Sequence, residues 1–300
     1  MNMKPLVLSV LLAPGLALAG TPINETREVD ATARIDVSND KGAVNVSPRD
    51  KNELAISGTL GDGAKRLAID GGRGSLSIRV EGPDKSKGSL WGSDTSMQET
   101  ILDLKVPRAA ALEIGVVSAE VSVSDTSGGN VQVDSVSGRL RLASVQSPRL
   151  RLESVSGDID FQGRSDDASI ETVSGDMIVR GVGGRTRAET VSGGMRITAA
   201  SPFKQFDASS VSGDMEITGA LASGGRVEIE TMSGDVRLNL PAAVSAKITA
   251  ESFSGTLRSD FGTVRKPDRG PGTSLDANAG SGDGEISVDS FSGDVTIRKE

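Results

Sequence analysis

The sequence predicts an all-β protein that forms a single-domain parallel β-solenoid, a β-helix with about 19–21 residues per coil. The first observation is a repeated Ser/Thr-Val-Ser-Gly-Asp corner, which occurs twice in RLESVSGDIDFQGRSDDASIETVSGDMIVR, residues 151–180. The second is the spacing of the corner glycines, which recur every 18 to 21 residues except for a last interval of 38. The third is the alternation of apolar and polar residues beside each corner, which is typical of half-buried strands. The eight corner glycines are Gly138, Gly157, Gly175, Gly193, Gly213, Gly234, Gly255 and Gly293.

Aligning the copies on the corner glycine places their apolar residues in columns. We expect five columns to point into the core, two, five and seven residues before the glycine and two and four residues after it. Met177, Met195 and Met215 share one of these columns, so we expect core packing rather than a metal role for them. In two consecutive copies the five inward residues are Leu150, Leu152, Val155, Ile159 and Phe161, and then Ala168, Ile170, Val173, Met177 and Val179.

One such coil is not stable alone. Five buried side chains contribute about 8–15 kcal/mol, whereas ordering costs about 1–2 kcal/mol for each of roughly twenty residues. Each coil therefore needs neighbours above and below it, as in other solenoids. A propeller is the alternative repeat architecture, but it needs about four antiparallel strands per 40–50 residues, which the unit with one corner and two arms does not supply.

We predict that the corner residues form and stabilise the turn. We expect glycine there because a sharp corner requires a positive φ, and we expect the neighbouring serines and aspartates to hydrogen-bond their own backbone. The corner aspartates could instead bind calcium as in β-rolls, but the GGxGxDxUx nonapeptide of those proteins is absent. These aspartates are Asp158, Asp176, Asp214, Asp235 and Asp294.

The chain divides into three parts. Residues 1–19 contain Lys4, an apolar run and a terminal Ala17-Leu18-Ala19, the order of a signal peptide cleaved before Gly20. Residues 20–108 form irregular β coils with an exposed loop at 81–98, and residues 109–300 form the regular repeat with an insertion at 261–274. We therefore expect an exported protein of the periplasm or cell surface, without a membrane span after signal cleavage.

Composition excludes several functions. The sequence has no cysteine and no histidine, which removes thiol nucleophiles, imidazole catalysis and the usual zinc sites. It has no tyrosine, one tryptophan and six phenylalanines, few platforms for stacking sugars or bases. Its formal net charge of −8 disfavours nucleic acid as a partner. No cofactor motif is found, because the glycine clusters lack the strand–GxGxxG–helix context.

An acidic residue stands four positions before the corner glycine in seven of the eight copies, and Ser209 fills the eighth. Stacked coils turn this column into an acidic stripe, which Arg151 and Arg187 are placed to neutralise in part. The stripe is either a solvated, salt-bridged face or a binding surface for divalent ions or a cationic partner. Its members are Asp134, Glu153, Glu171, Glu189, Glu230, Glu251 and Asp289.

Trp91 is a further candidate site residue. It is the one conspicuous aromatic side chain of the predicted exposed loop, where it either contacts a ligand or anchors the loop on the solenoid. A carbohydrate-active lyase or glycosidase would need such an aromatic residue beside a local cluster of acids. The acids here are instead dispersed by the repeat, so we predict no catalytic residues.

The VSNDKGAVNV pair, the LKVPRAAALEIGVVSAEV passage and the closing ISVDSFSGDVTIRK resemble a family of exported bacterial β-strand-repeat proteins. The family is of unknown function and is labelled as candidate adhesins; the resemblance covers about residues 34–300. It implies a right-handed β-solenoid at the cell envelope with no established catalytic residues. Together these observations predict a non-enzymatic adhesin-like or scaffold protein that binds an envelope protein, surface protein or polysaccharide. The alternatives are a carbohydrate-active β-helix enzyme and a calcium-dependent binding module.

Overall fold

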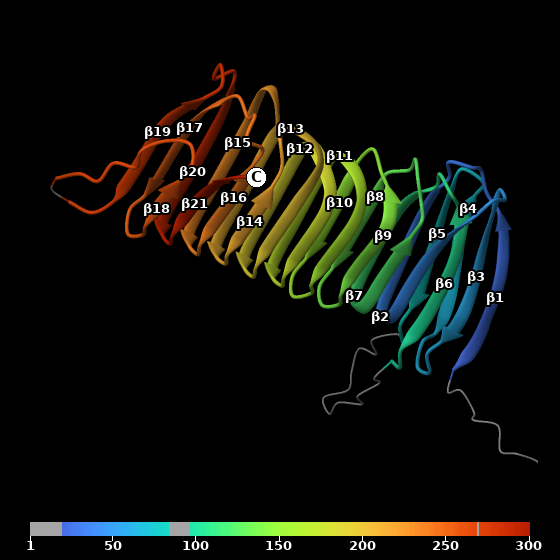
Figure 1. The fold of residues 1–300 in the computed structure, drawn as a ribbon. Coiled ribbons are helices and arrows are strands. Elements are labelled where there is room, and N and C mark those ends of the chain that lie inside the picture. The colour runs from blue at the N-terminus through green and yellow to red at the C-terminus, as the bar shows by residue number, and fades with distance from the viewer. Residues whose placement is uncertain (1–19, 84–96, 269) are drawn as a thin grey trace, which may run out of the picture.

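The computed structural model describes residues 20–83, 97–268 and 270–300, and these form an elongated all-β molecule (Figure 1). The described residues contain 21 strands in one hydrogen-bonded network, and the strands run across the long axis. These residues contain no helix, and so none long and apolar enough to cross a membrane. The predicted signal peptide, Trp91 and most of the predicted loop at 81–98 lie outside the described residues.

The N-terminal end of the molecule combines parallel and antiparallel pairs. β2 pairs in parallel with β5, β6 and β7, whereas the outer pairs β1–β3, β3–β6 and β4–β5 are antiparallel. These antiparallel pairs, of which only β4–β5 is a hairpin, end the stack instead of a further coil. The strands are β1 (Thr21–Glu28), β2 (Arg34–Arg49), β3 (Glu53–Leu60), β4 (Arg66–Gly72), β5 (Ser75–Glu81), β6 (Thr100–Pro107) and β7 (Ala111–Ser124).

The middle of the molecule is a regular stack of parallel arms. The arm before each corner pairs with the arm before the next corner, as in Leu152 opposite Ile170, and the arms after the corners pair likewise, as in Phe161 opposite Val179. The predicted columns are therefore ladders. The strands are β8 (Val131–Ser135), β9 (Leu140–Gln146), β10 (Leu150–Ser154), β11 (Ile159–Ser174), β12 (Met177–Ser192), β13 (Met195–Ser212) and β14 (Met215–Thr218).

At the C-terminal end the coils do not follow chain order. The last coil is inserted between the two that precede it: β20 lies between β15 and β17, and β21 lies between β16 and β18 (Figure 1). Residues 261–268 and 270–272, in the predicted insertion, precede β19, which pairs antiparallel with β17 and ends the stack. The strands are β15 (Leu221–Ser233), β16 (Val236–Leu240), β17 (Ala246–Ser252), β18 (Leu257–Ser259), β19 (Thr273–Ala279), β20 (Gly284–Ser292) and β21 (Val295–Lys299).

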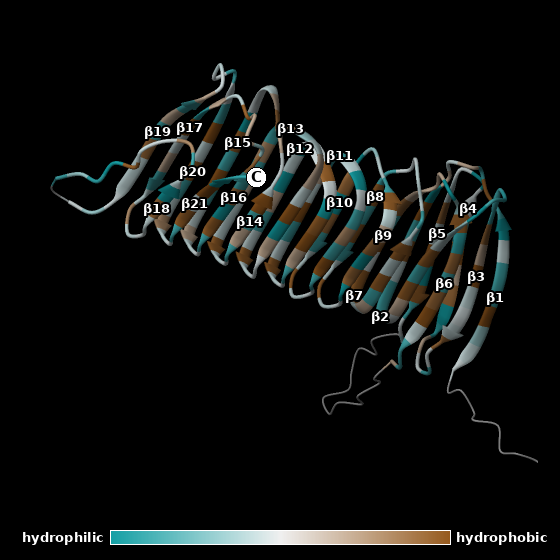
Figure 2. Cartoon of the chain, in the orientation of Figure 1, coloured by the Kyte–Doolittle hydropathy of each residue, from teal (hydrophilic) through white to brown (hydrophobic). Residues whose placement is uncertain are grey.

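The core is a single apolar cluster along the length of the stack. Apolar bands on neighbouring strands line up across the molecule (Figure 2), and Met177, Met195 and Met215 are buried as predicted. The column two residues before the glycine was predicted wrongly, because Val155 and Val173 are 47% and 46% exposed. The alternation continues unbroken to the third residue before the glycine, which is buried, and the phase slips only at the glycine. These buried polar residues are Ser135, Ser154, Thr172, Thr190, Ser210, Thr231, Ser252 and Ser290.

The corner glycines stack on one another, and close approach explains their identity better than φ does. A Cβ added to Gly157 would lie 2.0 Å from the carbonyl oxygen of Gly138, and one added to Gly175 would lie 2.4 Å from that of Gly157. The predicted positive φ occurs at only three of the eight, Gly193, Gly234 and Gly293. Stacked backbones thus leave no room for any side chain on this side of the corner.

The corner serines and aspartates have different roles. The Ser154 hydroxyl accepts a hydrogen bond from the N–H of Gly157 at 2.9 Å, which is the predicted bond within one turn. Asp176 instead bonds the next coil, because its Oδ1 accepts from the N–H of Gly194 at 2.9 Å. Asp294 likewise accepts from the Thr256 N–H at 2.8 Å. The aspartates therefore tie coils together, in place of the predicted bonds to their own backbone.

Candidate functional site

The predicted acidic stripe forms one ladder on the outer face of the arms before the corners. Asp134 lies opposite Glu153, and Glu171 follows on the next rung. Ser209 occupies one rung between Glu189 and Glu230. Because the last coil is inserted, the order at the C-terminal end is Glu230, Asp289, Glu251, which differs from the order in the sequence.

The stripe is neutralised unevenly along its length. Arg151 forms an ion pair with Glu153 and Arg187 forms one with Glu189, so both predicted counter-charges are present. No cation of the described residues pairs with Glu230, Asp289 or Glu251, although the Ser287 hydroxyl donates a hydrogen bond to Asp289 at 3.1 Å. The negative charge is therefore least compensated at the C-terminal end.

A second ladder of large apolar side chains runs beside the acidic one, two residues further along each strand. Its nine members are between 46% and 57% exposed, so they lie on the surface and not in the core. The backbone register aligns them, since Ser212 lies opposite Ser233 and Thr231 opposite Ser290. The members are Val117, Val136, Val155, Val173, Val191, Val211, Met232, Phe291 and Phe253.

The apolar ladder is the surface feature that sequence reasoning missed. Its residues were assigned to the core because they are apolar, with a phase slip placed just before them. Strict alternation from Leu150 and Leu152 points Ser154 inward and Val155 outward, which is what the structure shows. Successive side chains of a strand point to opposite faces, so the odd or even position of each residue along the strand shows which way it points. Hydropathy alone did not show this.

The two ladders line one continuous groove, which we call the ladder groove. Its N-terminal section has a volume of about 650 Å³ and its C-terminal section about 1000 Å³, and the two sections share Thr190, Ser209 and Val211. At the C-terminal end the rings of Phe253 and Phe291 stack with their centroids 5.1 Å apart and their planes 11° from parallel. The groove is therefore lined by apolar side chains along its length, and an acid lies on every rung from Asp134 to Glu251 except that of Ser209.

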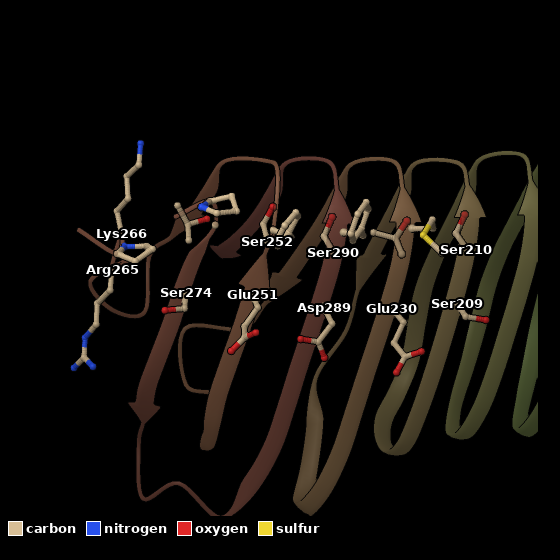
Figure 3. Close-up of a pocket in the computed structure, with 18 of the residues that line it drawn as sticks. Ser209, Ser210, Glu230, Glu251, Ser252, Arg265, Lys266, Ser274, Asp289 and Ser290 are labelled. Carbon is tan, nitrogen blue, oxygen red and sulfur yellow. The ribbon is translucent and has the colours of Figure 1, made fainter. Parts of the chain in front are cut away.

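A loop forms the C-terminal end of the ladder groove. In Figure 3 Ser209, Glu230, Asp289 and Glu251 follow one another on consecutive strands, and Arg265 lies at the far end. The Arg265 backbone exchanges two hydrogen bonds with that of Ser274, at 2.8 and 3.0 Å, which fixes the base of this loop. The exposed side chains of Arg265 and Lys266 place positive charge where the acidic ladder stops.

A second groove, of about 650 Å³, lies on the arms after the corners, and it differs in its charge pattern. There Arg196 donates to Glu216 at 2.9 Å, and Arg258 lies 3.4 Å from Asp294. The hydrogen bond from the Thr256 N–H is the main cause that lowers the pKa of Asp294, with a smaller contribution from Arg258. Two of its arginines are thus paired within the protein, whereas no ion pair involves Glu230, Asp289 or Glu251 of the ladder groove among the described residues.

The described residues form neither a calcium site nor a carbohydrate-active site, the two alternatives that the sequence left open. No group of three or more Asp or Glu side chains there is arranged to hold a metal ion. The acids of the stripe are spread over successive coils, and Trp91, on which the carbohydrate-active alternative relied, lies outside the described residues. Away from both grooves, at the β4–β5 hairpin, the hydrogen bond from Arg66 to Glu81 lowers the pKa of Glu81 and raises the pKa of Arg66.

Three solved structures were matched to the chain at low sequence identity, one of them with a TM-score above 0.5. A candidate lipid-binding protein from Parabacteroides distasonis is 14% identical, covers 94% of this chain and 99% of its own, and has a TM-score of 0.52. A candidate adhesin from Bacteroides fragilis is 13% identical, with coverages of 93% and 97% and a TM-score of 0.40. A candidate adhesin from Parabacteroides distasonis is 10% identical, with coverages of 93% and 98% and a TM-score of 0.41.

No curated protein matches the sequence. The profile of one family, described as Toastrack DUF4097, matches residues 32–298, which is nearly the whole of the described molecule. Its match begins just before β2 and spans the parallel stack and the inserted last coil. This chain therefore belongs to the Toastrack DUF4097 family.

Proposed function

We propose that this protein is a non-enzymatic, adhesin-like binding protein of the bacterial cell envelope, and that it binds through the ladder groove. In this proposal residues 1–19 direct export, and the mature chain acts in the periplasm or at the cell surface. In this proposal the stack is a right-handed β-solenoid, as the resemblance of the sequence to exported β-strand-repeat proteins implies.

The observation that carries the proposal is the exposed apolar ladder. Nine large apolar side chains in one row remain about half exposed, although the same fold buries its other apolar columns almost completely. At about 4.8 Å per rung the row is about 38 Å long. Contiguous apolar surface of this kind on a soluble protein marks an interaction site.

The groove suits a binding role better than a catalytic one. Its polar groups repeat from coil to coil, so they offer many equivalent contacts along a line instead of one distinct constellation. A catalytic site needs groups of different kinds that converge on a single reacting atom. Repeated identical contacts are what a long, extended ligand surface can use.

The proposal is tested with the mature chain, residues 20–300, immobilised on a biosensor. We would measure its binding to the protein fraction and to the polysaccharide fraction of the envelope of the organism that carries it. The Val173→Ser, Val191→Ser double variant should lose most of this binding. Ile101→Ser is the matched control, because Ile101 is 42% exposed but lies outside the groove.

Two results would overturn the proposal. Equal binding by the groove variant and the control would show that the groove is not the site. Release of reducing sugar ends or unsaturated products from the polysaccharide fraction would show that the protein is an enzyme. Export is measured separately, by fusing residues 1–19 to a reporter that is active only outside the cytoplasm.

A further inference from the structure

We propose that the ligand of the ladder groove is a basic amphipathic α-helix of a partner protein, lying along the stack axis. This inference rests on the proposed binding function and names the chemistry of the partner. The apolar face of the helix would cover the apolar ladder, and a neighbouring stripe of lysine or arginine would face the acidic ladder. Helix-in-groove docking is an established recognition mode that uses such a pattern.

The dimensions of the two ladders favour a helix. The rungs are about 4.8 Å apart and the ladders are offset by two residues, or about 7 Å. An α-helix repeats its surface every 5.4 Å, so side chains at i, i+3, i+4 and i+7 advance about 0.6 Å more than one rung per turn, and the helix slips by about one rung over the length of the groove. The whole groove, about 38 Å long, accommodates about 25 helical residues at 1.5 Å per residue.

An extended strand fits the groove less well. Its same-side residues repeat about every 6.8 Å, out of step with the rungs. It also needs unpaired backbone groups, which are found at a sheet edge. The ladder groove lies on the face of the sheet, where the backbone groups of Glu230, Asp289 and Glu251 are already paired with neighbouring strands. Side-chain contacts alone therefore define the recognition here.

The charge pattern of the groove indicates the sign of the partner's charge and the section of the groove where binding is strongest. In the N-terminal half, Arg151 and Arg187 already neutralise Glu153 and Glu189. In the C-terminal half, Glu230, Asp289 and Glu251 lie on successive rungs, and no described cation pairs with them. A partner's lysine or arginine residues placed there would supply the missing counter-charge, which electrostatic complementarity favours.

The largest apolar members of the groove lie beside these three acids. Met232, Phe291 and Phe253 are 57%, 55% and 50% exposed, and the two phenylalanine rings stack. Large apolar and aromatic side chains dominate the energy of most interfaces, and the ring faces also attract cations. Arg265 and Lys266 at the loop would repel a cation that extended further, so they mark the end of the basic stripe.

The test uses synthetic peptides and fluorescence anisotropy with the mature chain, residues 20–300. The probe is a labelled helix of about 18 residues, about 27 Å long, with leucine on one face and lysine on the adjacent face. One control peptide replaces every lysine with glutamate, and another has the same composition in scrambled order. The probe should bind, and neither control should bind at comparable concentration; raising the salt concentration should weaken binding.

Two protein variants locate the binding. Neutralising the acids with Glu230→Gln, Asp289→Asn and Glu251→Gln should raise the Kd about tenfold or more, since three exposed charge pairs are lost. Phe253→Ser with Phe291→Ser should weaken binding at least as much. The matched control is Asp62→Asn, Asp70→Asn and Glu99→Gln, which removes the same charge from exposed residues at the N-terminal end and should leave the Kd unchanged.

The remaining outcomes are decisive. Equal binding of the scrambled or acidic peptide, or equal loss in the control variant, would overturn the proposal. Binding of phosphatidylcholine vesicles that requires Phe253 and Phe291, without binding of the lysine peptide, would identify a lipid as the ligand instead. If envelope binding depends on Val173 and Val191 while the peptide does not bind, the proposed function stands and the helix is wrong. If envelope binding does not depend on them, both proposals fall.

Discussion

The rings of Phe253 and Phe291 stack face to face, 5.1 Å apart between centroids, because the last coil of the chain lies inside the stack and not at its end. In chain order, Phe253 would follow Met232 directly. Insertion of β20 places Phe291 between them and makes the two phenylalanines neighbours. The section of the ladder groove with the larger volume, about 1000 Å³, lies at this point.

Engineered disulfides test the order of the coils. The chain contains no cysteine, so Glu230→Cys with Asp289→Cys introduces the only pair. These residues are partners on adjacent parallel strands, within the Cα separation of about 4.4–6.8 Å that a disulfide requires. We expect efficient oxidation, seen as a faster band on a non-reducing gel.

The matched pair is Glu230→Cys with Glu251→Cys. These positions are two rungs apart, about 9.6 Å, which is beyond the reach of a disulfide. If this pair closes and the first does not, the coils follow chain order and the inserted arrangement is wrong.

Gly175→Ala should destabilise the protein by about 1–3 kcal/mol, because its Cβ would lie 2.4 Å from the Gly157 carbonyl oxygen and neighbouring coils would have to separate. Gly115→Ala is the control, since an added Cβ there meets no atom within 4 Å. Urea unfolding gives both free energies. A loss of stability at Gly115 as large as that at Gly175 would argue against stacked corners.

Val173→Ala should change the free energy of unfolding by less than about 0.5 kcal/mol, because Val173 is 46% exposed. Ile170→Ala, in the same strand but fully buried, should cost about 2–5 kcal/mol. Thermal unfolding followed by circular dichroism compares the two variants. A larger loss of stability in Val173→Ala than in Ile170→Ala would show that the valine column is buried and that there is no exposed apolar ladder.

Asp294 should make the stability of the molecule depend on pH. Its pKa is lowered in the folded state, chiefly by the hydrogen bond from the Thr256 N–H. The stabilising contribution is therefore fully present above the pKa of the unfolded chain, about 3.9, and is lost as the pH falls through the lower folded value. The difference in urea midpoint between the wild type and Asp294→Ala should shrink over that acidic range.

Asp294→Asn is the companion variant for this measurement. Its amide oxygen can still accept the bond from Thr256, but it does not titrate. It should retain part of the stability near neutral pH and show no acidic transition of its own. A midpoint difference between wild type and Asp294→Ala that stays constant down to the acidic limit would show that Asp294 is not coupled to folding.

The sequence predicted the stacked coils because the same residue types recur at equivalent positions of successive repeats. Equivalent residues such as Glu153 and Glu171 lie opposite each other, and the acidic ladder was therefore predictable residue by residue. The apolar ladder was predictable only in principle. Its valines are as apolar as core residues, and only the parity of the strand shows that they point outward.

The amino-acid sequence by itself determined the repeating coil, the inward methionines and the line of acids, because each depends on contacts between identical positions of neighbouring copies. The tertiary structure alone decided which copies are neighbours. Any coil with the same pattern of inward and outward residues can pair with its neighbour through backbone hydrogen bonds. The sequence around Glu251 and that around Asp289 therefore do not show which of the two lies opposite Glu230. That choice depends on where the loop after Ser259 leads the chain, and it sets the order of the acids and phenylalanines in the groove.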